Sequence, residues 1–306
     1  MFVGFECSHL SVWCLDYGLN SNGTPALGDS CLDLTWDECV AVGLNRLISE
    51  PAIFCFDALR TNLMFHPKGP TCFELAVQAL SSTEKGYDLL APKFDYTPFR
   101  TPDAVLEAVA AHIGDPASVG SALDVCCGTG AAMRMLRPLC HDQVVGLDMS
   151  EGMLSVGRER TADAPGDAEL MFLRANALNM PFVAEFDVVV CFGALGHILW
   201  KDQPRFVEQI SQVLKPGGRF FMAISKMPPI WSKRYWMSRA FNCAMHLRNL
   251  LLTPPFIMYY LTFLLPEAKA LLQARSFEVE VCEEVFKGKF KDLRLVIATR
   301  TTTDRS

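Results

Sequence analysis

Residues 122–136 read ALDVCCGTGAAMRML, an apolar segment that leads through a glycine-spaced turn into a helical pattern. Because glycine has no Cβ, Gly128 and Gly130 would let the backbone come close to a bound ligand. The same two glycines could also do no more than make a tight turn between a strand and a helix. A Gly-x-Gly spacing is weak evidence by itself, so the segments around it must decide.

The segments after the turn alternate between strand and helix patterns. Apolar or alternating runs of strand length recur at residues 121–126, 143–149, 170–175, 186–193 and 218–225. Strands separated by helices predict βαβ units, whose right-handed crossovers build a parallel sheet covered on both faces. We therefore expect an α/β fold. Residues 99–113 predict a helix before the first strand, with Thr101 as N-cap and Pro102 at the first helical position.

The amino-terminal part has a different character. Residues 1–80 hold six of the twelve cysteines and show no strand and helix alternation. Thr35 and Thr71 are each followed three residues later by a glutamate, Glu38 and Glu74, which is the capping-box pattern of a helix start. We expect residues 1–80 to form a helical extension, and the polar composition of residues 81–88 to mark its boundary with a domain over 81–306.

Composition restricts the kind of partner. The net charge of −6 and the pI near 5.6 argue against nucleic acid, since such binding requires a basic field. The cysteines are scattered and the adjacent pair Cys126 and Cys127 has no zinc-site spacing, so no metal is expected. The first thirteen residues lack the pattern of a signal peptide, which favours a cytoplasmic protein. A small-molecule ligand fits these properties best.

A carboxylate at the end of the next strand identifies the class of ligand. Asp148 lies 18 positions after Gly130, where it can accept hydrogen bonds from both hydroxyls of a ribose. A dinucleotide fingerprint would need glycine at position 133, which is Met133 here, and no Gly-Lys-Ser/Thr follows for a phosphate loop. The pattern therefore predicts a nucleoside ligand and disfavours NAD.

Five segments together resemble a known family. The segments are LDVCCGTG (123–130), VVGLDMSEGML (144–154), ANALNMPF (175–182), FDVVVCFGALGHI (186–198) and VLKPGGRFF (213–221). In order and spacing they resemble the class I S-adenosylmethionine-dependent methyltransferases, in particular the ubiquinone/menaquinone C-methyltransferase-like group of methyltransferase types 11 and 25. The resemblance implies a Rossmann-like, seven-stranded, mostly parallel sheet with helices on both faces, whose closing helix and last two strands lie in residues 266–300.

The resemblance also implies a cofactor, S-adenosyl-L-methionine, and residues that hold it. The loop from Asp124 through Cys127, Gly128 and Thr129 to Gly130 would wrap the methionine part, and Asp148 would hold the ribose. Around the adenine, the family usually places an aspartate where this chain has Asn176, whose carbonyl can still accept the same hydrogen bond. Ala177 would offer a backbone N–H to the ring, and Met149 would pack on its face.

Two positions depart from the family pattern, and one segment adds to it. Cys126 stands where glycine is commoner, and Gly196 stands where many relatives have glutamate before the histidine. The segment GYDLLAPKFDYTPFR (86–100) is similar to a family segment that folds over the cofactor, which makes Tyr87 and Tyr96 candidate lid residues. Plain aromatic packing on the domain surface is the alternative for both tyrosines.

The implied methyl transfer needs few catalytic groups. A sulfonium is already a good leaving group, so the enzyme has to align the reacting atoms and exclude water. If a general base is needed, His197 is the candidate, because it follows the fourth strand at the edge of the cleft. A structural histidine bonded to backbone is the alternative. Cys127 and Cys191 have no neighbouring base in the sequence that would make either a nucleophile.

Residues 226–265 interrupt the expected order, because a helix should follow the strand that ends near Ser225. This insertion could be a lid that walls an apolar pocket, a surface that docks on a membrane, or a subdomain that packs on the sheet. As a lid it would contribute six aromatic wall residues, Trp231, Tyr235, Trp236, Phe256, Tyr259 and Tyr260. No oligomeric state is indicated.

These observations lead us to expect an S-adenosylmethionine-dependent methyltransferase that moves a methyl group in line to a small, apolar or aromatic acceptor. Two alternatives remain open, a non-catalytic nucleoside-binding module and a membrane-associated methyltransferase of a lipid or quinone. A protein or RNA methyltransferase is disfavoured by the acidic balance and by the absence of an Asn-Pro-Pro-Tyr-type motif.

Overall fold

The computed structural model describes residues 66–301 in full. Before them it describes the backbone of two short antiparallel strands, β1 (Gly18–Leu19) and β2 (Pro25–Ala26). The chain divides into two compact units, Gly4–Thr61 and a larger unit of Met1–Val3 with Asn62–Ser306. The expected helix start at Thr35 lies outside the described residues.

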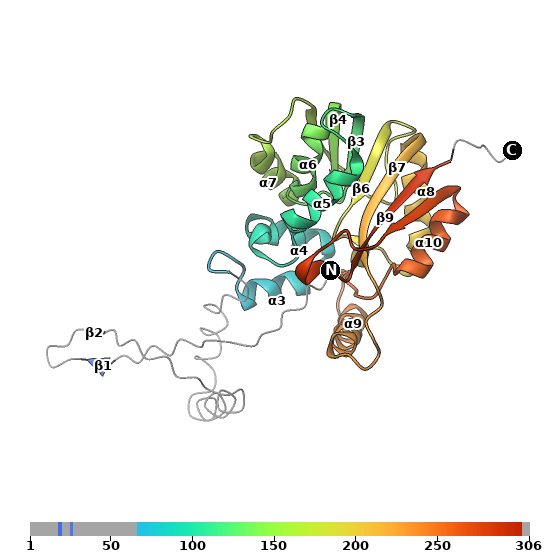
Figure 1. Cartoon of the computed structure of the whole chain (residues 1–306). Coiled ribbons are helices and arrows are strands. Elements are labelled where there is room, and N and C mark those ends of the chain that lie inside the picture. Colours follow the sequence, from blue (N-terminus) through green and yellow to red (C-terminus); the bar gives the residue numbers. More distant parts are fainter. Residues whose placement is uncertain (1–17, 20–24, 27–65, 302–306) are drawn as a thin grey trace. The chain divides into compact units, whose positions relative to one another are not determined.

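A seven-stranded sheet forms the centre of the larger unit, in the order β5-β4-β3-β6-β7-β9-β8 (Figure 1). Strands β3 to β7 are parallel, and β9 runs antiparallel to both of its neighbours, β7 and β8. The bounds are β3 (Val119–Val125), β4 (Cys140–Asp148), β5 (Glu169–Arg174), β6 (Phe186–Cys191), β7 (Leu214–Ser225), β8 (Phe277–Cys282) and β9 (Leu293–Arg300). The expected Rossmann-like α/β fold is confirmed.

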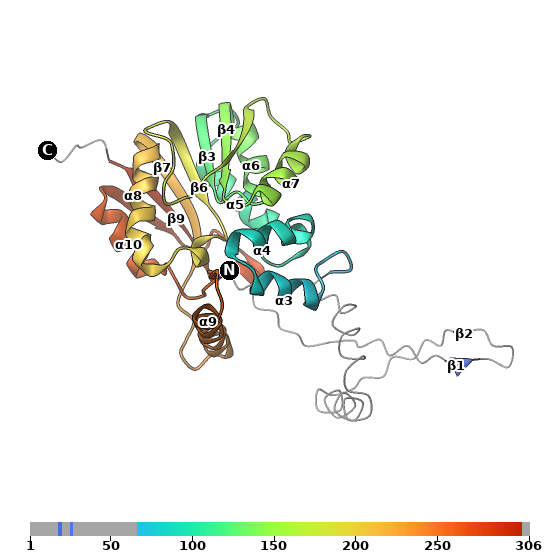
Figure 2. The same ribbon diagram turned by 180° about the vertical axis from the view of Figure 1, so that it is seen from behind.

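Helices cover both faces of this sheet (Figures 1 and 2). One face carries α5 (Asp103–Ile113), α6 (Ala131–Leu136) and α7 (Glu151–Thr161), and the other carries α8 (Gln203–Val213) and α10 (Leu265–Ala274). Successive strand residues point to opposite faces, so Phe220 belongs to the core under α8 and Phe221 to the core under α5 and α6. Both phenylalanines are fully buried. The near-continuous apolar runs of the strands follow from this double burial.

Short 3₁₀ helices complete these layers. They are η1 (Ala91–Tyr96), η2 (Arg137–Leu139), η3 (Leu195–His197), η4 (Trp200–Asp202) and η5 (Gly288–Phe290). At α5 the expected cap is displaced by one residue: Pro102 is the N-cap, and no side chain caps the helix. Thr101 instead lines a cavity at the edge of the sheet, and its carbonyl accepts a bond from Arg100.

Within residues 66–102, two helices precede α5 and pack on each other, α3 (Cys72–Leu80) and α4 (Thr83–Leu90). The expected capping box at Thr71 and Glu74 is confirmed, with both reciprocal bonds formed. Asp88 on α4 accepts hydrogen bonds from the Ser150 hydroxyl (2.5 Å) and the Gly152 N–H (2.9 Å). These bonds join α4 to the start of α7. Since α3 belongs to the same compact unit as the sheet, the boundary expected at residues 81–88 falls inside that unit.

The insertion between β7 and α10 consists of helix α9 (Lys233–Leu251) and a segment that we call the strap, residues 252–264. Two asparagines of α9 hold the strap by its backbone. Asn242 bonds both the N–H (2.8 Å) and the carbonyl (2.7 Å) of Tyr260, and Asn249 does the same for Phe256 (2.9 and 3.0 Å). Among the described helices, none has the length and apolar character needed to cross a membrane.

Arg248 ties this insertion to the two preceding helices. Its guanidinium donates to the carbonyls of Ala79 (2.9 Å) and Ser81 (2.8 Å), at the end of α3, and to that of Pro254 (2.7 Å) in the strap. We expect Arg248→Ala to lower the free energy of unfolding by about 1–3 kcal/mol, because several carbonyls lose a charged donor. Amide exchange in residues 242–251 should become faster.

Arg239→Ala is the matched control, because Arg239 lies on the same helix and is exposed, with the Tyr235 ring 6.0 Å away. Urea unfolding and hydrogen exchange measure both effects. Equal stability of the two variants would show that Arg248 does not fix the insertion.

Candidate functional site

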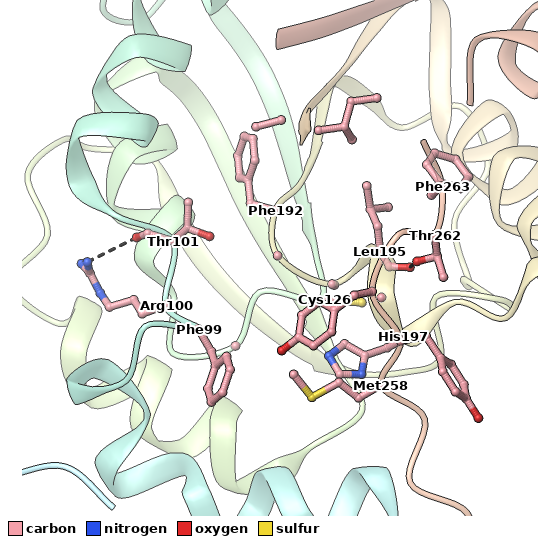
Figure 3. Close-up of a pocket in the computed structure, with 18 of the residues that line it drawn as sticks. Phe99, Arg100, Thr101, Cys126, Phe192, Leu195, His197, Met258, Thr262 and Phe263 are labelled. Atoms are coloured by element: carbon pink, nitrogen blue, oxygen red, sulfur yellow. Dashed lines mark hydrogen bonds between the residues drawn. The ribbon is translucent and has the colours of Figure 1, made fainter. Parts of the chain in front are cut away.

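A cavity opens at the carboxyl ends of β3, β4, β6 and β7, the edge at which parallel sheets bind ligands. The turns after these strands form its floor, and α4, η1 and the strap form its walls. Figure 3 shows Cys126, His197 and Met258 approaching it from three different segments. Residues far apart in the sequence therefore meet in one site.

Asp148, the last residue of β4, joins two of these turns. Its Oδ2 accepts the N–H of Gly128 (2.9 Å) and its Oδ1 accepts the N–H of Ser150 (2.9 Å). Burial raises the pKa of this carboxyl, although the backbone N–H groups oppose the shift by favouring the charged form. A carboxylate oxygen has a second lone pair, so each can still accept a hydrogen bond from a ligand.

Asp124, near the end of β3, is the unusual group of the site. The residue is 2% exposed and lines the cavity, and its Oδ2 has no hydrogen-bond partner within the described part of the chain. Burial first, and the charge of Asp148 second, raise the pKa of Asp124 well above the usual range. Buried polar atoms are normally paired. A ligand that brings a cation or an N–H group would satisfy this oxygen.

The two glycines of the turn have different roles. Gly128 has a φ of +52° and lines the cavity, and a Cβ there would meet only Phe94 Cε1, at 3.8 Å. Gly130 has a φ of +79°, but its Cβ would lie 2.7 Å from Thr161 Cγ2 on α7, and it does not line the cavity. Gly128 therefore leaves space for a ligand, whereas Gly130 permits close packing of α6 on α7.

Cys126 adopts the backbone conformation that glycine favours. Its φ is +59°, in the left-handed region where a side chain costs roughly 1–2 kcal/mol. This explains why glycine is the commoner residue in the pattern. Cys126 and Cys127 both line the cavity. A hydrogen bond with Cys191 and burial raise the pKa of the Cys126 thiol, and burial raises that of Cys127, so neither is an activated nucleophile.

His197 lies between a tyrosine and the strap. Its Nδ1 is 2.5 Å from the carbonyl oxygen of Ile257, and its Nε2 is 2.8 Å from the Tyr87 hydroxyl. A carbonyl only accepts, so geometry assigns the proton to Nδ1 and leaves Nε2 to accept from Tyr87. Burial lowers the pKa of His197 and raises that of Tyr87. The pair is therefore neutral at pH 7.

The structure brings most of the expected cofactor residues together, but not all. Asp124, Cys127, Gly128, Thr129, Asp148, Met149 and Tyr87 line the cavity. Asn176 is exposed and outside the lining, and its Oδ1 accepts the N–H of Leu178 (2.9 Å). Ala177 is buried in the core. Tyr96 stacks on His66 with ring centroids 4.9 Å apart, so packing holds it away from the cavity.

Sequence reasoning missed several residues of the site. Phe94, Phe99 and Phe192 line the cavity with their rings. Asp95 accepts a hydrogen bond from the Thr129 hydroxyl (2.5 Å) and so joins η1 to the glycine turn. Phe94 and Phe99 lie in the same segment as Tyr87 and Tyr96, so their aromatic character could have indicated a place in the cavity wall.

The insertion contributes to the site differently from the expectation. Tyr259 and Tyr260 line the cavity, whereas Trp231 and Trp236 are exposed on the surface. Tyr235 is half-buried outside the lining, and the buried ring of Phe256 stacks on Tyr87, with centroids 6.3 Å apart. Strap residues 258 and 261–264, which the sequence did not single out, complete this wall.

The strap also explains the glycine at position 196. Tyr259 donates its N–H to the Gly196 carbonyl (2.9 Å), and a Cβ on Gly196 would lie 2.6 Å from the Tyr259 carbonyl oxygen. A glutamate at this position would displace the strap. The departure of Gly196 from the family pattern therefore accompanies the insertion.

Two comparisons with known proteins both match methyltransferases. Residues 122–218 match a family model described as a methyltransferase domain. The demethylmenaquinone methyltransferase of Symbiobacterium thermophilum is 38% identical over 109 residues, which are 35% of this chain and 43% of that protein. The chain thus spans less than half the length of this curated relative.

Solved structures show the same fold. A complex between the Haloferax volcanii Trm112 methyltransferase activator and a methyltransferase matches with a TM-score of 0.53 and 18% identity, over 74% of this chain and all of that one. Haemonchus contortus phosphoethanolamine N-methyltransferase 2, solved with phosphomonomethylethanolamine and S-adenosylhomocysteine, matches with a TM-score of 0.52 and 19% identity, over 72% and 58%. At these identities the likeness concerns the fold alone.

The raised pKa of Asp124 predicts how stability depends on pH. A carboxyl with a folded pKa above its unfolded value of about 3.9 binds more protons in the folded state. Its contribution to stability is present at low pH and is lost as pH rises from about 4 toward the raised pKa. Urea unfolding between about pH 5 and about pH 8 should therefore give a steeper decline for the parent than for Asp124→Asn. Equal slopes would show that Asp124 ionises normally.

Asp148 offers a test of ligand binding. We expect Asp148→Ala to raise the dissociation constant for S-adenosylmethionine or its demethylated product roughly ten- to hundredfold, since a charged acceptor is worth about 1.5–3 kcal/mol. Isothermal calorimetry measures this change. Asp167→Ala, an exposed carboxylate outside the cavity lining, is the control and should bind as the parent does. An unchanged constant for Asp148→Ala would remove this residue from the binding site.

Proposed function

We propose that this protein is a class I S-adenosylmethionine-dependent methyltransferase, with the methyltransferase domain matched at residues 122–218 as its core, and that it transfers a methyl group from S-adenosylmethionine to a small apolar or aromatic acceptor. The observation that carries the proposal is the unpaired, buried oxygen of Asp124 in the cavity. The methyl donor has an ammonium group and a sulfonium. Either cation would compensate this carboxylate, which no described residue does.

The chain's own residues account for the other parts of the donor. The free lone pairs of Asp148 would accept the ribose hydroxyls, next to the open space above Gly128. Met149 is 44% exposed at the edge of the cavity and could pack on an adenine ring. Asn176 and Ala177 would contact the adenine only if the base reached beyond the cavity lining. When bound, the donor supplies an activated methyl group on a sulfonium leaving group.

The character of the walls supports an apolar acceptor. Phe94 lines the cavity. Figure 3 shows further apolar side chains of the lining, those of Phe99, Phe192, Leu195, Met258 and Phe263. Such walls would hold an apolar molecule in line with the methyl group and keep water out. The S. thermophilum relative is named a demethylmenaquinone methyltransferase, and a quinone-type acceptor would belong to this class.

The Tyr87 and His197 pair would remove the proton that the acceptor loses. Both side chains line the cavity, and because the Tyr87 hydroxyl occupies Nε2 of His197, His197 acts through Tyr87 and not directly on the acceptor. The Tyr87 oxygen takes the acceptor's proton as its own proton passes to His197 Nε2. The new bond to the methyl carbon forms from the acceptor's electron pair, and the carbon–sulfur pair stays on sulfur. The Ile257 carbonyl stabilises the resulting imidazolium through Nδ1–H.

Turnover should depend on this pair while donor binding does not. We expect Tyr87→Phe to lower turnover about hundredfold, the scale of general acid–base catalysis, with an unchanged dissociation constant for the donor. Tyr96→Phe is the control, because Tyr96 packs on His66 outside the cavity. A radiolabelled methyl donor with 1,4-naphthoquinol as acceptor probe serves as the assay. Equal turnover in the parent and Tyr87→Phe would leave alignment as the whole mechanism.

The lowered pKa of His197 sets the pH dependence. A base is active when unprotonated, so turnover should stay level through neutral pH and fall only below the usual imidazole value of about 6.5.

A second candidate function, a nucleoside-binding module without catalysis, is open to a direct test. Mass spectrometry of the copurifying ligand, followed by a screen of phenols and quinols, separates the two. Bound donor with no methyl transfer to any acceptor would favour the module.

A further inference from the structure

Helix α9 carries an apolar stripe that faces away from the domain. A helix turns about 100° per residue, so residues at spacings of three and four share one face. On this face lie Trp236, Ala240, Cys243, Leu247 and Leu250, and all five are exposed. Trp236 is 64% exposed and Leu250 is 81% exposed. Figures 1 and 2 both show α9 projecting at the end of the domain that carries α3.

The opposite face of α9 fixes this orientation. Ser238 and Met245 are buried there, and Asn242 and Asn249 hold the strap. Arg248 bonds to carbonyls of α3, Ser81 and the strap. Turning the stripe inward would break all of these contacts, so the apolar side chains stay in solvent as a built feature of the fold.

Residues next to the stripe enlarge the apolar area. Trp231, just before the helix, is 83% exposed, and Leu251, at its end, is 70% exposed. We call Trp231, Trp236, Cys243, Leu247, Leu250 and Leu251 together the α9 surface. Exposed apolar groups are ordinary when scattered, but a continuous group of large ones marks an interaction site.

The charge around the α9 surface is one-sided. Residues 226–265 contain five lysines and arginines and no carboxylate, in a chain with a net charge of −6. Lys226 and Arg234 pair with Glu283 and Asp292, both at 3.3 Å, outside the insertion. Lys233 and Arg239 are exposed and have no carboxylate partner among residues 66–301. Both lie on α9 beside the stripe, one on each flank at helical spacing.

We propose that the α9 surface docks on an anionic membrane. Tryptophan and leucine side chains enter the boundary between headgroups and acyl chains, while lysine and arginine at the edge attract acidic headgroups. A second copy of this chain is a poorer occupant. Two α9 surfaces placed face to face would oppose cations to cations, since the segment has no carboxylate to pair with them.

Docking would place the membrane beside the cavity. Arg234 and Ser238 of α9 line the cavity from the inner side of the same helix. The binding surface and one wall of the cavity are thus parts of a single element. Membrane docking itself does not depend on methyl transfer, so its test is independent of the proposed function.

Vesicle cosedimentation with the full chain tests the proposal. Vesicles of phosphatidylcholine with roughly one third phosphatidylserine should bind the protein at least about tenfold more tightly than vesicles of phosphatidylcholine alone. Leu247→Glu combined with Leu250→Glu should lower the binding to anionic vesicles by roughly tenfold or more. Val183→Glu, at an exposed apolar residue between β5 and β6, is the control and should bind as the parent does.

A second variant tests the contribution of Lys233 and Arg239, and urea unfolding checks that every variant is folded. Lys233→Ala with Arg239→Ala should weaken binding to anionic vesicles and reduce its dependence on salt. All variants should keep the parent's urea unfolding midpoint. Absence of binding by the parent, or equal binding of the Leu247 and Leu250 variant, would overturn the proposal. A dimer in lipid-free buffer that this variant abolishes would instead assign the surface to a second copy.

Discussion

The carboxylate of Asp148 is the constraint on which the site depends. By accepting the N–H groups of Gly128 and Ser150, it holds the turns after β3 and β4 at one place. Ser150 in turn bonds Asp88, and that bond joins α4 to the edge of the sheet. Without this acceptor two partly buried N–H groups would lose their partner, at a cost comparable to a hydrogen bond each. The same carboxylate thus supports the fold and faces the ligand space.

The site combines two kinds of surface with different physical tasks. At the ends of β3 and β4, burial and then the charge of Asp148 raise the pKa of Asp124, and one Asp124 oxygen has no partner among the described residues. At the end of β6, the strap, Tyr87 and the phenylalanines form an apolar enclosure. The carboxylates suit a cationic methyl donor, and the apolar enclosure suits an apolar acceptor. The two halves meet where Tyr87 bonds His197, and there the proposed proton transfer takes place.

The insertion after β7 gives this domain its individual character. One side of α9 binds the strap through Asn242 and Asn249, and the strap covers Gly196 so closely that no side chain fits there. The other side presents Trp236 and Leu250 to solvent. An element that closes the cavity on its inner side therefore carries an apolar surface on its outer side. The seven-stranded sheet has to supply neither property.

The sequence by itself determined the layered core and the position of the ligand edge. Hydrophobic periodicity is local, so it located β3 to β7 and the turn at Gly128. The family resemblance implied the last two strands, and the order of the motifs placed Asp124 and Asp148 beside the turn. Only the tertiary structure decided which aromatic residues reach the cavity: Tyr87 does and Tyr96 stacks on His66, although both stand in one short segment. It also showed that Gly128 lines the cavity whereas Gly130 serves packing, and that Trp231 and Trp236 lie outside the cavity lining. These positions depend on contacts between segments distant in the chain, such as Tyr87 with His197 and Gly196 with Tyr259. Local sequence patterns cannot predict such contacts.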